Sequence, residues 1–87
     1  MSNTHELKTW PESYEPIEQG LKPFEIRLND RDYRVGDILI LREFDPGVGQ
    51  YTGRATVANV RFILAGEKWG LKPGYVAMSI DRKIVMI

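Results

Sequence analysis

The residues best suited to chemistry lie in one short stretch, Gly20-Leu21-Lys22-Pro23-Phe24-Glu25-Ile26-Arg27. An arginine offers a planar pair of donors that fits a phosphate or the edge of a base, and a lysine adds a mobile positive charge. A glutamate accepts from an exocyclic amine or orients the arginine. In an extended chain with ~3.3 Å per residue, Lys22, Glu25 and Arg27 fall within roughly 15 Å. This cluster suits a nucleotide, and Lys22 with Glu25 also suits an acid–base pair.

A strand must position this cluster. Phe24 to Leu28 alternates strictly between apolar and charged residues, which predicts a half-buried strand. We expect Phe24, Ile26 and Leu28 on the core side, and Glu25 with Arg27 on the opposite, non-core side. The plainer alternative is an ordinary solvated strand face whose ion pair contributes only ~0–1 kcal/mol.

The remaining elements are predicted from periodicity, glycine and proline. Pro11 suits a helix start and Gly20 a helix end, which predicts a helix or two short turns over 11–19. Further strands are predicted over 5–10, 37–43, 54–64, 75–80 and 84–87, with a turn over 29–32, a hairpin loop over 47–53 and a structured loop over 65–74. The fold class is mostly β with one or two short helices (α+β), as one domain over 1–87. A small closed or nearly closed barrel would protect the strand edges.

The charged stretch resembles a known family. Gly20, Lys22, Glu25 and Arg27 are similar to the Gly-x-Lys-x-x-Glu-x-Arg motif of ASCH domains in the PUA-like superfamily. The wider pattern resembles the DUF3850 branch of that group. The matching segments are residues 5–9, 22–27, 29–33, 35–39 and 74–76, in the family's order and across nearly the whole chain.

The resemblance implies a PUA-like β-barrel with a cleft beside the motif, where RNA or a nucleotide would bind. By position, Lys22, Glu25 and Arg27 would line this cleft. The DUF3850 pattern adds four residues: His5, Lys8, Asp30 and Arg31. In a regular strand His5 and Lys8 face opposite sides, so both reach one cleft only if that strand twists or bends.

One ASCH branch hydrolyses acetylcytidine. The resemblance implies that its motif lysine activates a threonine at the position that Glu25 occupies here. A carboxylate cannot replace that nucleophilic hydroxyl, so this departure argues against an inherited amidohydrolase reaction. Acid–base work or hydrolysis by Lys22 and Glu25 stays open, and the sequence does not decide whether the protein is an enzyme.

Composition narrows the function classes. The 87 residues carry 12 Lys and Arg against 12 Asp and Glu, so the formal net charge is zero. This balance disfavours broad, non-specific nucleic-acid binding but allows a compact basic pocket. With no cysteine and one histidine, the sequence predicts no disulfide, no metal site and no cofactor. No apolar run is long enough for a membrane span, and without an export signal we expect a cytoplasmic protein.

Three functions fit these observations. The first is a module that binds RNA or a modified nucleotide through the predicted cleft. The second is a small hydrolase acting on a modified nucleoside or RNA, with Lys22 and Glu25 as its acid–base pair. The third is a protein-interaction domain using the loop around Trp69. Trp10 and Trp69 are also candidates for stacking on bases, although tryptophans in small domains more often pack in the core or at its rim.

Overall fold

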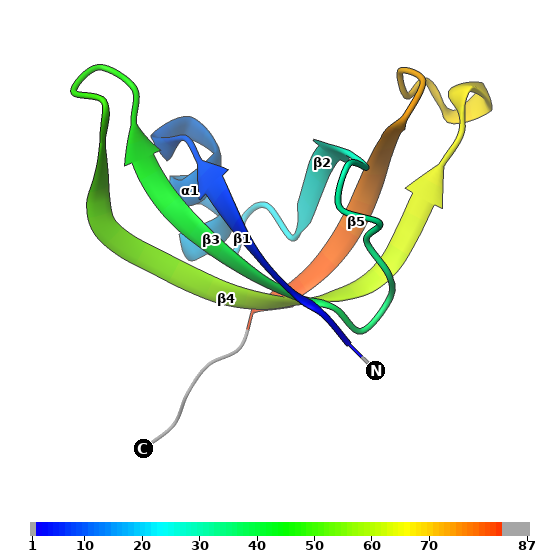
Figure 1. Ribbon diagram of the computed structural model, residues 1–87, viewed down its shortest axis with the longest axis horizontal. Helices are drawn as coiled ribbons and strands as arrows, with labels where there is room; N and C mark the ends of the chain where they lie inside the picture. The colour runs from blue at the N-terminus through cyan, green and yellow to red at the C-terminus, as the bar shows by residue number, and fades with distance from the viewer. Residues whose placement is uncertain (1, 83–87) are drawn as a thin grey trace.

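The computed structural model describes residues 2–82, which form a curled five-stranded sheet with a short helix packed against it (Figure 1). The elements in chain order are β1 (Thr4–Thr9), α1 (Pro11–Glu18), β2 (Phe24–Leu28), β3 (Ile38–Asp45), β4 (Gln50–Ala65), the 3₁₀ helix η1 (Glu67–Trp69) and β5 (Tyr75–Arg82). The predicted helix and five of the predicted strands are therefore confirmed to within a few residues. The sixth predicted strand, over 84–87, lies outside the described residues.

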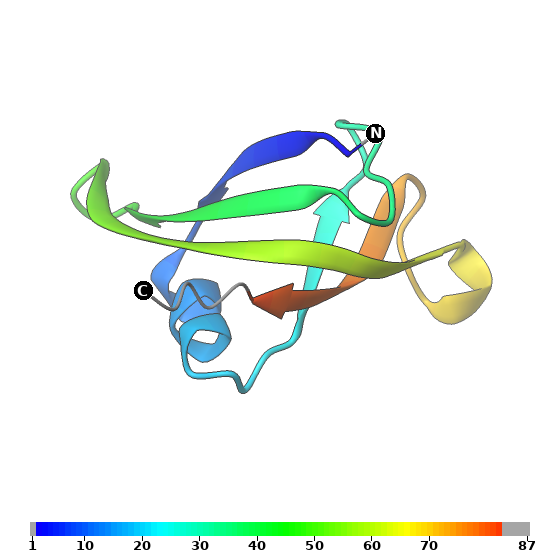
Figure 2. The same cartoon turned by 90° about the horizontal axis from the view of Figure 1, so that it is seen from below.

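The sheet has the strand order β1-β3-β4-β5-β2. β1 runs parallel to β3, and every other neighbouring pair is antiparallel. The sheet bends into two arms, with β1 and β3 in one, β5 and β2 in the other, and β4 running through both (Figures 1 and 2). Within residues 2–82 no backbone ladder joins the two edge strands, β1 and β2. The predicted mostly-β fold is confirmed, in the form of a half-barrel.

A β-bulge in β4 contributes to the curl. The pairing of β4 with β5 shifts between Val60 and Phe62. Ala58 and Val60 are buried, but Phe62 is 63% exposed and Ile63 packs against the core instead. Regular alternation along β4 would place Phe62 on the side of Val60, and the bulge breaks this alternation. An extra residue moves every later side chain to the other face and increases the local bend.

The core fills the inside of the curl. Its side chains come from the helix and from every strand except β2, with one more from the loop before β3. They are Leu7, Ile17, Tyr33, Leu39, Leu41, Ala58, Val60, Val76, Met78 and Ile80. Fully burying one such large aliphatic side chain contributes about 1.5–3 kcal/mol, so this cluster is the main source of stability.

β2 lies with its charged row inward, which is the opposite of the prediction. Glu25 is only 2% exposed, whereas Phe24, Ile26 and Leu28 are 43%, 51% and 47% exposed. The alternation itself is confirmed, but the expectation that the apolar row faces the core is wrong. Ser13 of α1, Lys22 and Arg27 donate the hydrogen bonds that the buried Glu25 carboxylate requires, and β1 provides acceptors for Arg27.

Arginines from the sheet hold α1 in place. Tyr14 and Ile17 are buried beneath the helix. Arg54 on β4 pairs with Glu15 of the helix and with Glu43 of β3, the second contact at 3.0 Å. Helix α1 is also the longest helix in residues 2–82, and no helix there is long and apolar enough to cross a bilayer.

Arg82 supplies a second anchor for the helix. Its Nη1 donates to the carbonyl of Glu18, and its Nε donates to Thr56 Oγ1 at 3.2 Å. Arg82 is the last residue of β5, and Lys83 lies outside the described residues.

Candidate functional site

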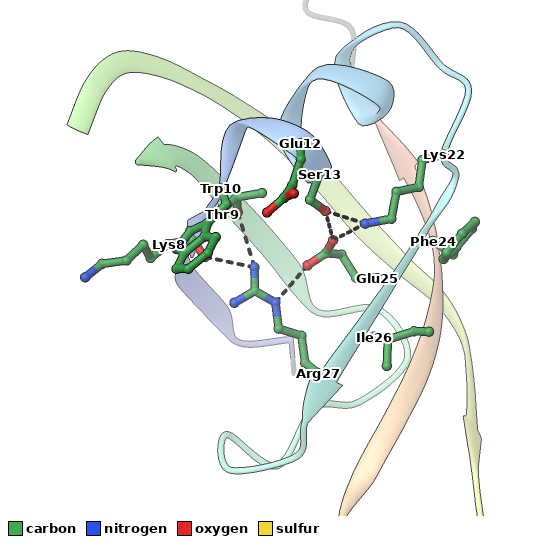
Figure 3. Close-up of a pocket in the computed structure, with 10 residues that line it drawn as sticks. All are labelled: Lys8, Thr9, Trp10, Glu12, Ser13, Lys22, Phe24, Glu25, Ile26 and Arg27. Carbon is green, nitrogen blue, oxygen red and sulfur yellow. Dashed lines mark hydrogen bonds and ion pairs between the residues drawn. The ribbon is translucent and has the colours of Figure 1, made fainter. Parts of the chain in front are cut away.

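The buried carboxylate of Glu25 is the centre of a hydrogen-bonded cluster (Figure 3). Arg27 Nε donates to Glu25 Oε2 at 2.7 Å. Lys22 Nζ lies 3.4 Å from Glu25 Oε1, and Ser13 Oγ donates to that same oxygen at 3.3 Å. Lys22 Nζ also donates to Ser13 Oγ. The three motif side chains that the sequence grouped are thus brought together, and a serine from α1 joins them.

Local chain geometry explains how Lys22 reaches the cluster. Gly20 follows α1 with a φ of 78°, in the left-handed region that side chains other than glycine rarely adopt. The amide groups of Leu21 and Lys22 then donate to the carbonyl of Pro16 at 2.8 and 3.1 Å. This tight exit from the helix directs Lys22 back over the start of β2.

An open pocket of about 380 Å³ lies over the cluster. Its lining combines the four clustered side chains with residues from β1, α1 and β2, as Figure 3 shows. They are Lys8, Thr9, Trp10, Glu12, Ser13, Lys22, Phe24, Glu25, Ile26 and Arg27. Trp10 lines this pocket and is about half exposed, so the predicted stacking residue is available to a bound ring. We call this the first pocket.

Two arginines bridge the gap between β1 and β2, which we call the seam. Arg27 Nη2 donates to the carbonyl of Lys8 at 3.0 Å and to Thr9 Oγ1 at 3.3 Å. Arg31 Nη1 donates to the carbonyl of Glu6 at 3.2 Å. Carbonyls two residues apart point to the same side of a strand, so both arginines satisfy the free edge of β1.

A second pocket of about 300 Å³ lies further along the seam. It shares Arg27 and Ile26 with the first pocket and includes the predicted residues Asp30 and Arg31. The full lining is Leu7, Ile26, Arg27, Leu28, Asp30, Arg31, Tyr33 and Tyr75. Burial raises the pKa of Tyr33, so its hydroxyl stays protonated at neutral pH.

The structure does not bring the His5 ring into either pocket. His5 Nε2 lies 2.8 Å from Asp37 Oδ2, and the imidazole packs edge-on against Tyr33 with ring centroids 4.9 Å apart. Burial alone would raise the pKa of Asp37. Hydrogen bonds from the Asn3 amide, His5 and the Arg34 amide outweigh burial and hold this pKa below its ordinary value. This second buried carboxylate ties the N-terminal end of β1 to the start of β3.

Lys8 reaches the first pocket only in part. In Figure 3 its side chain points away from the cluster, and its ammonium lies 4.2 Å from the centre of the Phe44 ring. Its carbonyl is the group that contacts Arg27. His5 and Lys8 therefore lie on opposite sides of β1, as strand geometry predicts. Trp69 belongs to η1 and lines neither pocket.

Ser13 is the residue that sequence reasoning missed. The available signal was its place in the first turn of the helix that leads into the motif. Within residues 2–82 there is no group of three histidine or carboxylate side chains arranged to hold a metal ion. The candidate site is thus a set of charged, hydroxyl and aromatic groups around an open pocket.

Comparison with known proteins gives two findings. The family described as "Domain of unknown function (DUF3850)" matches residues 4–80. The chain is also similar to a protein of Escherichia phage P2 named "Uncharacterized 12.9 kDa protein in GpA 3'region". The two are 35% identical over 69 residues, which make up 79% of this chain and 62% of the phage protein. The chain therefore spans less than two thirds of that relative's length.

Proposed function

Because the chain belongs to the DUF3850 family, whose function is unknown, we propose a function from the site itself: the protein binds RNA or a nucleotide in the first pocket. The observation that carries this proposal is the fixed position of Arg27. Glu25 and the edge of β1 hold its Nε and Nη2 in place. No hydrogen bond to its Nη1 is found within residues 2–82, which leaves a preoriented donor beside an open pocket.

The neighbouring groups complement this donor. Arg27 and Lys22 supply the positive charge for one phosphate, while Glu25 and Glu12 supply acceptors for the amino groups of bases. Trp10 offers a ring on which a base can stack. Since Glu12 and Glu25 offset the charges of Lys22 and Arg27, the pocket favours a ligand with both a phosphate and base donors over a dense polyanion such as duplex nucleic acid.

We also propose that the fold is of the PUA-like type and that the domain is an ASCH domain. Two observations support this assignment: the spacing of Gly20, Lys22, Glu25 and Arg27, and a curled sheet with a helix beside the motif. Superposition of an experimental structure on known ASCH domains tests it, and a different strand order would overturn it.

The binding proposal is tested with two arginine variants of equal charge change. We expect Arg27→Ala to weaken binding of a short single-stranded RNA at least tenfold in isothermal titration calorimetry. Arg61→Ala is the matched control because Arg61 is exposed, pairs with Asp81 at 3.4 Å and lines neither pocket. Equal affinity of the wild type and Arg27→Ala would remove the first pocket from the binding site.

A hydrolase is the second candidate, and one contact favours it. The hydroxyl of Ser13 lies between Lys22 Nζ and Glu25 Oε1, where it touches both an amine and a carboxylate. In a hydrolysis, Glu25 would accept a proton from an attacking water and Lys22 would donate one to the leaving group. We propose that Glu25→Gln then abolishes turnover of an acylated nucleoside, measured by chromatography. Undiminished turnover would exclude this pair.

A further inference from the structure

We infer that the natural ligand spans two nucleotide units, one in each pocket along the seam, with the linking phosphodiester at Arg27. This inference rests on the proposed function and specifies the ligand of the same site. The carrying observation is that the two pockets, about 380 and 300 Å³, share the side chain of Arg27. Both volumes lie near the lower end for small-ligand sites, so each fits one unit of nucleotide size.

The two pockets repeat the same set of groups. The first combines a cation, Lys22, with an aromatic ring, Trp10. The second combines a cation, Arg31, with the ring of Tyr75. A cation and a ring are the pair of groups that single-strand binders use for each successive phosphate and base. A repeat of this pair on either side of Arg27 therefore matches the repeat of a nucleotide chain.

The spacing of the arginines supports this match. Arg27 and Arg31 donate to the carbonyls of Lys8 and Glu6, which are two residues apart on β1. At ~3.3 Å per residue these anchor points are about 6.6 Å apart, which is comparable to the length of one nucleotide unit in an extended single strand, so Arg31 lies about one unit beyond Arg27. For Arg31, as for Arg27, only one of the guanidinium nitrogens has a hydrogen bond across the seam within residues 2–82.

The charge of the seam limits the length and kind of ligand. The Lys8 ammonium points away from the first pocket, toward Phe44. The other three cations of the two pockets, Lys22, Arg27 and Arg31, are opposed by Glu12, Glu25 and Asp30. A triphosphate would add several negative charges beside these carboxylates. A dinucleoside monophosphate brings one charge to Arg27 and two bases whose amino groups can donate to the acids. It is the smallest ligand that fills both pockets.

The experiment compares ligands of increasing length on the intact chain. Calorimetric titrations use a nucleoside monophosphate, a dinucleoside monophosphate of the same base and a nucleoside triphosphate, in moderate salt. We expect the dinucleoside monophosphate to bind at least tenfold more tightly than either of the others. Arg31→Ala should bring its affinity down to that of the monophosphate and leave the affinity for the monophosphate unchanged.

A neighbouring arginine provides the control. Arg34 is exposed, pairs with Asp32 at 3.0 Å and lines neither pocket, so Arg34→Ala should leave all three affinities unchanged. Equal affinity for the mono- and dinucleotide ligands, with no effect of Arg31→Ala, would overturn the two-unit inference and leave the proposed function standing. No binding of any nucleotide or of single-stranded RNA would overturn both.

Discussion

Two of the buried carboxylates, Glu25 and Asp37, have different surroundings. Glu25 is 2% exposed and Asp37 is 1% exposed, and each accepts hydrogen bonds from three residues. Two of the donors to Asp37 are backbone amides, and Asp37 lines neither of the two pockets. Every donor to Glu25 is a side chain, and the first pocket opens over it.

This difference distinguishes a carboxylate that serves the fold from one that is placed to serve the binding function we propose. Backbone amides cannot move away without local unfolding, so the hydrogen bonds of Asp37 are part of the folded structure. Side chains can exchange one hydrogen-bond partner for another, so Ser13 and Lys22 can turn toward a ligand while Arg27 keeps its hydrogen bond to Glu25. Equal burial therefore carries less information about function than the kind of donor and the access to solvent.

The largest expected effect comes from removing the structural carboxylate. Asp37→Ala leaves two backbone amides and the imidazole of His5 without their acceptor. We expect a loss of about 3 kcal/mol in the free energy of unfolding, because removing the carboxylate leaves each of its buried hydrogen-bond donors without an acceptor. Urea denaturation measures this. A loss below about 1 kcal/mol would show that water replaces the carboxylate easily, and the two sites would then be alike.

A substitution at Glu25 tests the carboxylate beneath the first pocket. Glu25→Gln keeps the shape but removes the charge that orients Arg27. We expect at least a tenfold loss of affinity for single-stranded RNA, with an unfolding free energy that falls by only about 1 kcal/mol because water can enter the open pocket. Calorimetry and urea denaturation of the same variant provide both values. A large stability loss with intact binding would reverse the comparison.

A pH titration sharpens the comparison through Asp37 alone. Its folded-state pKa is depressed, so the ionised carboxylate stabilises the fold above the unfolded pKa of about 3.9. This stabilisation is lost as the pH falls through the lower, folded-state pKa. The stability difference between the wild type and Asp37→Asn should therefore be constant above about pH 5 and shrink toward pH 2. A difference that grows on acidification would contradict the depressed pKa.

The smallest expected effect is that of the serine in the cluster. Ser13→Ala removes one hydroxyl that bridges Lys22 and Glu25, but those two groups still lie 3.4 Å apart. We expect affinity for single-stranded RNA to change by less than about threefold, which corresponds to under 1 kcal/mol. If the protein is a hydrolase that uses this hydroxyl, the same variant would instead lose its turnover while still binding.

Much of the fold follows from local patterns in the sequence. Alternation placed β2 at its observed bounds, and proline and glycine marked the ends of α1. A period of two, however, does not say which side of a strand is buried. Glu25 faces inward, where Ser13 of α1 donates to it, and Arg27 reaches the carbonyl of Lys8, far away along the chain. Those partners appear only once the sheet has curled.

The candidate site was predicted where its residues are neighbours in sequence. Lys22, Glu25 and Arg27 share one short segment, so any extended conformation keeps them close. Ser13 could not be placed because the direction of the chain between α1 and β2 depends on the turn at Gly20. His5 was grouped with this site by resemblance, but its partner Asp37 comes from a different part of the chain.

The side-chain bridges across the seam have a mechanical consequence. Everywhere else the sheet is closed by cooperative backbone ladders, whereas the seam is held by two arginine side chains that can detach one at a time. The seam is therefore the most compliant line in the half-barrel. A ligand bound there, as we propose, would tie the two edge strands together. Hydrogen–deuterium exchange of the β1 and β2 amides would then report how much ligand is bound, with no label on the ligand.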